Sequence, residues 1–311
     1  MRDFPSCFGE NGIQVSDASS SSCPPPPPAA TTTTTQNLVT CIYHSKLHNS
    51  SSFIITLTWT KTLMGQLLSI QINNKPTNQS LCNLQIKPWI FSKRKGYRTH
   101  QVGPTSIIFF WDLSSPKFGS SPEPIESFYF AITINQQLIL QLGDMEKELH
   151  KKMNNIGFNS SFSPNPVFVS KKEHIFGKKS SYSTTARFCG KGRNHEVSIE
   201  CKTMNTNNDD DLGLVIRIDG KTAMEVKRIR WKFRGNYTIL VDGLPVEVYW
   251  DVYGWFYGRL MGNGVFMFRS CLSAEKLWGS EMSWLNSLVE KDCVESSGLG
   301  FCLVLCVWKS E

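Results

Sequence analysis

The 311-residue chain lacks every feature that would commit it to a membrane or to secretion. It has no apolar run of about 18 residues, the length that a membrane-spanning helix requires. Its first residues, MRDFPSCFGENG, lack the apolar core of a secretory signal, and Arg2 stands where N-myristoylation needs glycine. We therefore expect an intracellular protein, cytoplasmic and with access to a membrane surface or the nucleus.

The chain also lacks the local patterns of cofactor sites. Its 10 cysteines include no CxxC pair, and it contains no glycine-rich phosphate loop and no EF-hand spacing. Glu173-His174 resembles an acid–base couple, but no third residue completes it. The sequence therefore predicts no metal, no cofactor and no catalytic residues, and we expect that the protein is not an enzyme.

Composition sets only broad limits. Hydrophobic residues make up 40% of the chain, which is typical of globular proteins, and 311 residues suffice for two ordinary cores. The net charge of +7 comes from 33 basic and 26 acidic residues. Such a charge is a modest bias towards anionic partners.

The most regular stretch runs from Leu214 to Asp251 and is typical of four antiparallel strands. Asp219-Gly220 and Asp242-Gly243 are two-residue hairpin signals, each flanked by β-branched and aromatic residues. Between them the segment from Val226 to Arg234 alternates basic and apolar residues. This period of two predicts a strand.

That predicted strand supplies the main candidate site. Its period places Arg228, Arg230, Lys232 and Arg234 on one face, and Ile229, Trp231 and Phe233 on the core face. Four cations in a row repel one another unless acidic side chains or a bound ligand neutralise them. A second basic turn, Lys93-Arg94-Lys95, is a candidate for the same surface, and Lys171-Lys172 and Lys178-Lys179 are further basic turns.

Two interpretations of the basic face stay open. The face is either solvated and paired with Glu247, Asp242 and the acidic loop Asp209–Asp211, or an anion platform. A platform would bind phosphoinositide headgroups, an acidic protein segment or nucleic acid. Nucleic acid is disfavoured because Trp231 and Phe233 are expected to point away from the cations and could not stack bases.

A divergent copy of the Leu214–Asp251 pattern lies earlier in the chain. Ile70-Gln71-Ile72-Asn73-Asn74-Lys75 matches Ile216-Arg217-Ile218-Asp219-Gly220-Lys221, and Phe110-Trp111-Asp112 matches Tyr249-Trp250-Asp251. We therefore predict an all-β, mainly antiparallel protein of two tandem, related sandwich-like or barrel-like units.

The predicted boundaries follow composition. Residues 1–35, with runs of serine, proline and threonine, are expected to be a disordered tail. Residues 36–153 form the first β unit and end in a helix from Gly143 to Met153 with Asp144 as its cap. Residues 154–311 form the second unit, which a strand from Leu299 to Trp308 closes.

Several long strings resemble the plant protein family catalogued as domain of unknown function 868. They include QNLVTCIY, KPWIFSKRKG, WDLSSPKFGSSPEPIESFY, KKEHIFGKK, WKFRGNYTILVDGLPVEVYWD and VFMFRSCLSAEKLW. The resemblance covers nearly the whole chain and implies a plant intracellular protein. It implies no activity, cofactor or catalytic residue.

Two functions are compatible with these patterns. The first is a non-catalytic binding or adaptor protein, whose partner is another protein or an anionic lipid headgroup. The alternative is a carbohydrate-active or carbohydrate-binding protein, in which Trp255, Phe256 and Tyr257 stack on sugar rings. Asp112 and Asp251 could supply paired carboxylates, although an Asp after Trp at a strand end commonly binds a turn amide.

Overall fold

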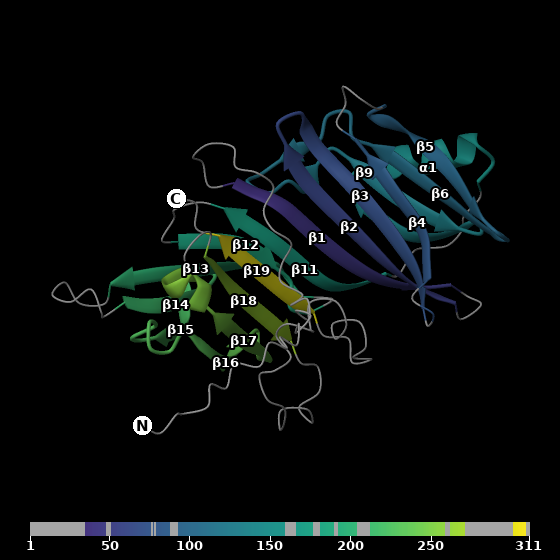
Figure 1. Cartoon of the computed structure of the whole chain (residues 1–311). Helices are drawn as coiled ribbons and strands as arrows, with labels where there is room; N and C mark the ends of the chain where they lie inside the picture. The colour runs from purple at the N-terminus through teal and green to yellow at the C-terminus, as the bar shows by residue number, and fades with distance from the viewer. Residues whose placement is uncertain are drawn as a thin grey trace, which may run out of the picture.

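The computed structural model describes residues 35–47, 51–75, 77, 79–87, 93–158, 166–176, 181–189, 192–203, 212–258, 262–270 and 301–308. Across these ranges the predicted all-β, mainly antiparallel fold is confirmed, because only the β11–β19 pair is parallel. Figure 1 shows two layered halves side by side. Residues 1–34, most of the predicted tail, lie outside the described part of the chain.

The first half is a sandwich of two antiparallel sheets. Its strands are β1 (Thr35–Lys46), β2 (Ser52–Thr62), β3 (Gly65–Lys75), β4 (Gln79–Ile86), β5 (Lys95–Val102), β6 (Thr105–Asp112), β9 (Tyr129–Ile134) and β10 (Gln137–Gly143). Strands β1 to β4 face the sheet ordered β10-β9-β6-β5, and a short pair, β7 (Lys117–Phe118) and β8 (Pro124–Glu126), lies in the β6–β9 connection. Alternate apolar residues such as Ile55, Ile70 and Phe109 fill the space between the sheets.

Helix α1 (Glu146–Asn155) covers the outer face of β6, β9 and β10. Leu149 and Met153 are buried there. The helix begins later than predicted, and Asp144 does not cap it, because its Oδ1 accepts the amide of Phe128 at 3.2 Å. The residue instead ties the end of β10 to the start of β9.

The second half repeats the sandwich arrangement. Its elements are β11 (Val167–Phe176), β12 (Ser181–Ala186), β13 (His195–Thr203), β14 (Leu212–Ile218), β15 (Lys221–Val226), β16 (Arg234–Val241), β17 (Leu244–Asp251), α2 (Tyr253–Tyr257), β18 (Asn263–Ser270) and β19 (Cys302–Trp308). The sheet β12-β13-β14-β15 faces β16-β17-β18-β19, and a second apolar core lies between them.

Strand β11 joins the halves into one sheet of nine strands. It pairs with β1 in antiparallel fashion and with β19 in parallel, so the sheet order is β16-β17-β18-β19-β11-β1-β2-β3-β4 (Figure 1). The predicted final strand therefore lies inside the sheet, between β18 and β11. All seven residues of β19 are buried, as its unbroken apolar pattern requires.

The β5–β6 and β16–β17 hairpins share one geometry. Lys95 pairs with Asp112 and Arg234 with Asp251, while a glycine in each hairpin lies against a tryptophan, Trp111 or Trp250. Each indole donates to a backbone carbonyl, at 3.0 Å and 2.8 Å. This shared geometry supports the predicted tandem relation, which stays a prediction together with the 36–153 and 154–311 boundaries.

A buried ionic cluster lies where β11 crosses between the two cores. The Lys171 ammonium is 2.7 Å from Glu173 and 3.5 Å from Glu123, and Glu173 also accepts the Thr184 hydroxyl at 2.7 Å. Burial lowers the pKa of Lys171, but the two carboxylates outweigh it and raise that pKa above its ordinary value. The interpretation of Lys171 as part of an exposed basic turn is therefore wrong. Lys178 and Lys179 lie outside the described residues.

His174, the neighbour of Glu173, does not form an acid–base couple with it. Successive strand residues point to opposite faces, so the His174 ring lies on the other side of the sheet. Burial, together with the charge of Lys172, lowers the pKa of His174 to about 4. The imidazole is therefore neutral near pH 7, as suits a residue that packs in a core.

Substitution of Lys171→Met should lower the free energy of unfolding by about 3–5 kcal/mol, because it leaves the fully buried Glu173 carboxylate without its cation. The midpoint of urea denaturation measures this loss. Lys117→Met, which removes an exposed pair with Glu126, is the matched control and should cost about 1 kcal/mol or less. Equal losses in the two variants would show that the buried pair does not hold the junction.

Candidate functional site

The predicted basic strand is not a strand. Strand β15 ends at Val226, and residues 227–233 form a turn-rich crossing to β16, which begins at Arg234. The chain must cross here from one sheet of the sandwich to the other, and Arg228 adopts a positive φ of 54° at the bend. The amides of Trp231 and Lys232 both donate to the Arg228 carbonyl. We call residues 227–234 the basic aromatic turn.

The side chains of the basic aromatic turn do not alternate between core and solvent. Ile229 alone is buried and packs in the second core, whereas Trp231 is 78% exposed. The exposed cations are Lys227, Arg228, Arg230, Lys232 and Arg234. The prediction that Trp231 faces the core is therefore wrong, and the indole shares its surface with the charges. Arg234 is paired with Asp251 at 2.8 Å, so it is the structural member of the set.

Aromatic rings from α2 support the turn. Phe233 packs on Tyr253 and Tyr257, with ring centroids 5.3 Å and 6.0 Å apart. The Arg230 guanidinium lies over Phe256 at 5.9 Å, and Tyr257 donates to the Arg230 carbonyl at 3.0 Å. These contacts hold the backbone of the turn in one shape while the cations face solvent.

The other predicted basic turn, Lys93 to Lys95, is a separate surface. All three side chains are exposed, but Lys95 forms a 2.6 Å ion pair with Asp112, and Arg94 donates to the Ser114 carbonyl. Strand β5 is the outer strand of its sheet in the first half, and β16 is the outer strand in the second half (Figure 1). The structure therefore does not bring the two predicted basic turns together.

Asp112 and Asp251 do not form a catalytic pair. They belong to the same two separate hairpins, and each carboxylate accepts the amide of the residue two positions later, Ser114 or Tyr253. Each also has its own basic partner. Both act as turn caps, in agreement with the second interpretation of the Trp-Asp pattern.

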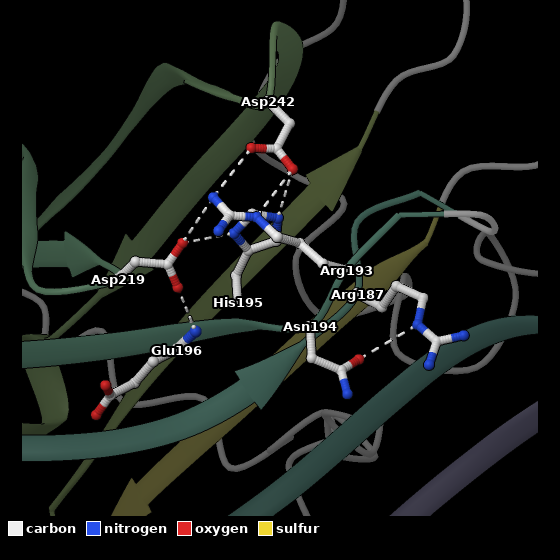
Figure 2. Close-up of polar contacts among 7 residues, drawn as sticks. All are labelled: Arg187, Arg193, Asn194, His195, Glu196, Asp219 and Asp242. Carbon is white, nitrogen blue, oxygen red and sulfur yellow. Dashed lines mark hydrogen bonds and ion pairs between the residues drawn. The ribbon is translucent and has the colours of Figure 1, made fainter.

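A charged network at the opposite end of the second sandwich was not predicted. His195, at the start of β13, is 3% exposed and lies between two carboxylates, with Nδ1 2.9 Å from Asp219 and Nε2 3.1 Å from Asp242 (Figure 2). Arg193 contacts the same two carboxylates at 3.3 Å. Both ring nitrogens can donate only when the imidazole carries two protons.

The network joins the two facing sheets. Asp219 is in the β14–β15 turn and Asp242 is in the β16–β17 turn, so Arg193 and His195 clamp hairpin tips from opposite layers (Figure 2). The two Asp-Gly signals were visible in the sequence as turns. Their meeting with a histidine from a third segment was not, because no local pattern records it.

The described residues contain no group of three or more side chains placed to hold a metal ion, and neither described helix is long and apolar enough to cross a membrane. Residues 34–309 match the family described as plant protein of unknown function, DUF868. No curated protein and no solved structure matches the chain.

The network should make stability fall in acid. A hydrogen bond from His195 lowers the pKa of Asp219, and one from Arg193 lowers that of Asp242. Their contribution is therefore complete above the unfolded pKa of about 3.9 and is lost as pH falls through the lower folded values. Between pH 7 and pH 3, the urea midpoint of Asp219→Asn/Asp242→Asn should fall less than that of the unmodified protein.

Glu225→Gln is the control for this titration, because Glu225 is exposed and has no ion pair within the described ranges. It should reproduce the acid loss of the unmodified protein. An unchanged acid dependence in the double Asn variant would show that the network contributes nothing to pH stability.

Proposed function

The chain belongs to a family of plant proteins of unknown function, and we propose that it is a non-catalytic intracellular binding or adaptor protein. The family has no known activity that would favour one function over another. Its basic aromatic turn binds anionic lipid headgroups. The observation that carries the proposal is Trp231, 78% exposed among the cations Lys227, Arg228, Arg230 and Lys232.

This combination of side chains suits a membrane interface. An indole has an apolar body and a polar N–H, so it partitions to the headgroup region, while cations are attracted to anionic lipids by about 1 kcal/mol each. Arg228 and Lys232 flank Trp231 closely in the chain, and no carboxylate pairs with either of them among the described residues. Their charges therefore face outward.

The turn is also held in place before it binds. Trp250 donates to the Lys232 carbonyl at 2.8 Å, Tyr257 to the Arg230 carbonyl, and Ile229 anchors the centre in the core. A surface that is already ordered loses little conformational entropy on binding.

The carbohydrate alternative has less support. Of its three aromatic residues, Trp255 is 7% exposed and donates to the Val307 carbonyl, so it is a core residue. Tyr257 is exposed, but its hydroxyl is used to hold the turn. Asp112 and Asp251, the carboxylates considered for hydrolysis, cap separate hairpins. Trp231, the most exposed aromatic side chain among the described residues, lies among cations.

Vesicle sedimentation tests the proposal. The full chain should bind vesicles that contain phosphatidylserine or phosphoinositide and should not bind neutral phosphatidylcholine vesicles, with affinity that falls as salt rises. Arg228→Gln/Arg230→Gln/Lys232→Gln should weaken binding about 100-fold, at about 1 kcal/mol for each cation. Trp231→Ala should weaken binding at high salt as well, because its contribution is apolar.

Lys147→Gln/Lys151→Gln/Lys152→Gln removes the same charge from α1 and is the matched control. An equal loss of vesicle affinity in the two triple variants would show that binding depends on net charge alone, and it would reject the turn as the site. Binding of a single-stranded oligonucleotide that the turn variant loses, with no binding to vesicles at equal phosphate concentration, would assign the turn to nucleic acid instead.

A further inference from the structure

The first sandwich has an open side. Strand β4 is the last strand of the nine-stranded sheet, and β5 is the last strand of the sheet that faces it. Between these two edges lies a cleft of about 530 Å³, lined by Cys82–Gln85 from β4 and by Arg98 and His100 from β5, with Phe109 at its base. Its volume is within the range of small-molecule sites, about 300–1,000 Å³.

The register of β5 explains why the cleft is open and polar. Arg98 lies opposite Phe109, and His100 lies opposite Ile107. Both partners belong to the apolar core, so Arg98 and His100 occupy positions that face the inside of the sandwich. Apolar side chains at these positions would close the edge.

The second sandwich has uncharged residues at these two positions, of which one, Ile239, is buried and the other, Tyr237, is 56% exposed. Its β16–β17 hairpin has the same register, in which Tyr237 and Ile239 stand where β5 has Arg98 and His100. Ile239 lies opposite Val246, is 4% exposed and belongs to the second core. The pair of Arg98 and His100 is therefore a property of the first sandwich and not a requirement of the hairpin.

The polar side chains of the cleft have no hydrogen-bond or ion-pair partner in the described part of the chain. Arg98, His100, Asn83 and Gln85 form no hydrogen bond or ion pair with another described side chain, and no carboxylate lines the cleft. Burial raises the pKa of the Cys82 thiol, and the charge of Arg98 partly offsets that rise, so the guanidinium acts on the inner wall of the cleft.

We propose that this cleft binds a small organic anion that carries a phosphate or carboxylate group. Arg98 holds the anion through its two-pronged donor geometry, and His100 supplies a further donor. Leu84 and Phe109 contact the apolar part of the ligand. This site is separate from the basic aromatic turn and does not depend on lipid binding there.

The competing explanation is that Arg98 and His100 only protect the sheet edge from pairing with another chain, since inward-pointing charges are a known device for this. Edge protection needs charge but no ligand. The two explanations therefore differ in whether an anion binds saturably.

Calorimetric titration of the full chain with phenyl phosphate provides the test, because the probe combines an anionic group with an apolar ring. We expect saturable binding with a Kd below about 1 mM, competition by inorganic phosphate and by benzoate, and no binding of phenol. Arg98→Gln/His100→Gln should weaken binding at least 10-fold. Arg94→Gln/His150→Gln, which removes the same residue types elsewhere, should leave it unchanged. Absence of binding, or equal binding in both variants, would overturn the proposal.

A second variant copies the two equivalent residues of the other sandwich, Tyr237 and Ile239. Arg98→Tyr/His100→Ile should abolish phenyl phosphate binding and raise the urea midpoint, because the new side chains extend the core. Binding by this variant as tight as that of the unmodified protein would reject the site. Arg228→Gln/Arg230→Gln/Lys232→Gln should bind phenyl phosphate normally, which separates this result from the lipid experiment.

Discussion

The structure depends on the pairing of β11 with two strands from different halves. Its hydrogen bonds to β1 and β19 join one sheet of each sandwich into a single nine-stranded sheet. The buried Lys171–Glu173 pair on this strand is costly to desolvate, but it fixes the register. A slip of one residue would turn both charges to the opposite face, where Glu123 and Thr184 could not meet them.

The two ends of the second sandwich are held in different ways. At one end, Arg193 and His195 clamp two short hairpin turns. At the other end, a longer crossing between sheets carries Trp231 and its cations on an anchored backbone. Because β16 and β17 run between these ends, the clamp and the basic aromatic turn share a rigid support, which is what a preformed binding surface needs.

Local chemistry predicted much of the fold, and tertiary constraints decided the rest. Asp219-Gly220 and Asp242-Gly243 are turns because their backbone requires positive φ, which Gly and Asp tolerate. The alternation from Val226 to Arg234 was misleading, since the chain must cross between sheets there and the period of two has no sheet to follow. The four predicted cations are exposed, but on a turn with Trp231 beside them.

Other features have no signature in the sequence at all. Lys171 looks like part of a basic surface run until β11 is placed between two cores. The network around His195 unites three segments, and Arg98 and His100 of β5 become informative only when they are compared with Tyr237 and Ile239 of β16. In each case the decisive neighbour comes from a distant part of the chain.

The position of β19 imposes an order on synthesis. The last strand of the first sandwich ends at Gly143, whereas β19 begins at Cys302 and lies between β18 and β11. At about 5–20 residues per second, a ribosome needs on the order of 10–30 seconds to make the intervening residues. The β19-facing side of β11 is an unpaired edge from the time that β11 is made until β19 is made, and the same holds for the β19-facing side of β18. The second half therefore cannot complete its sheet until this late strand has been made.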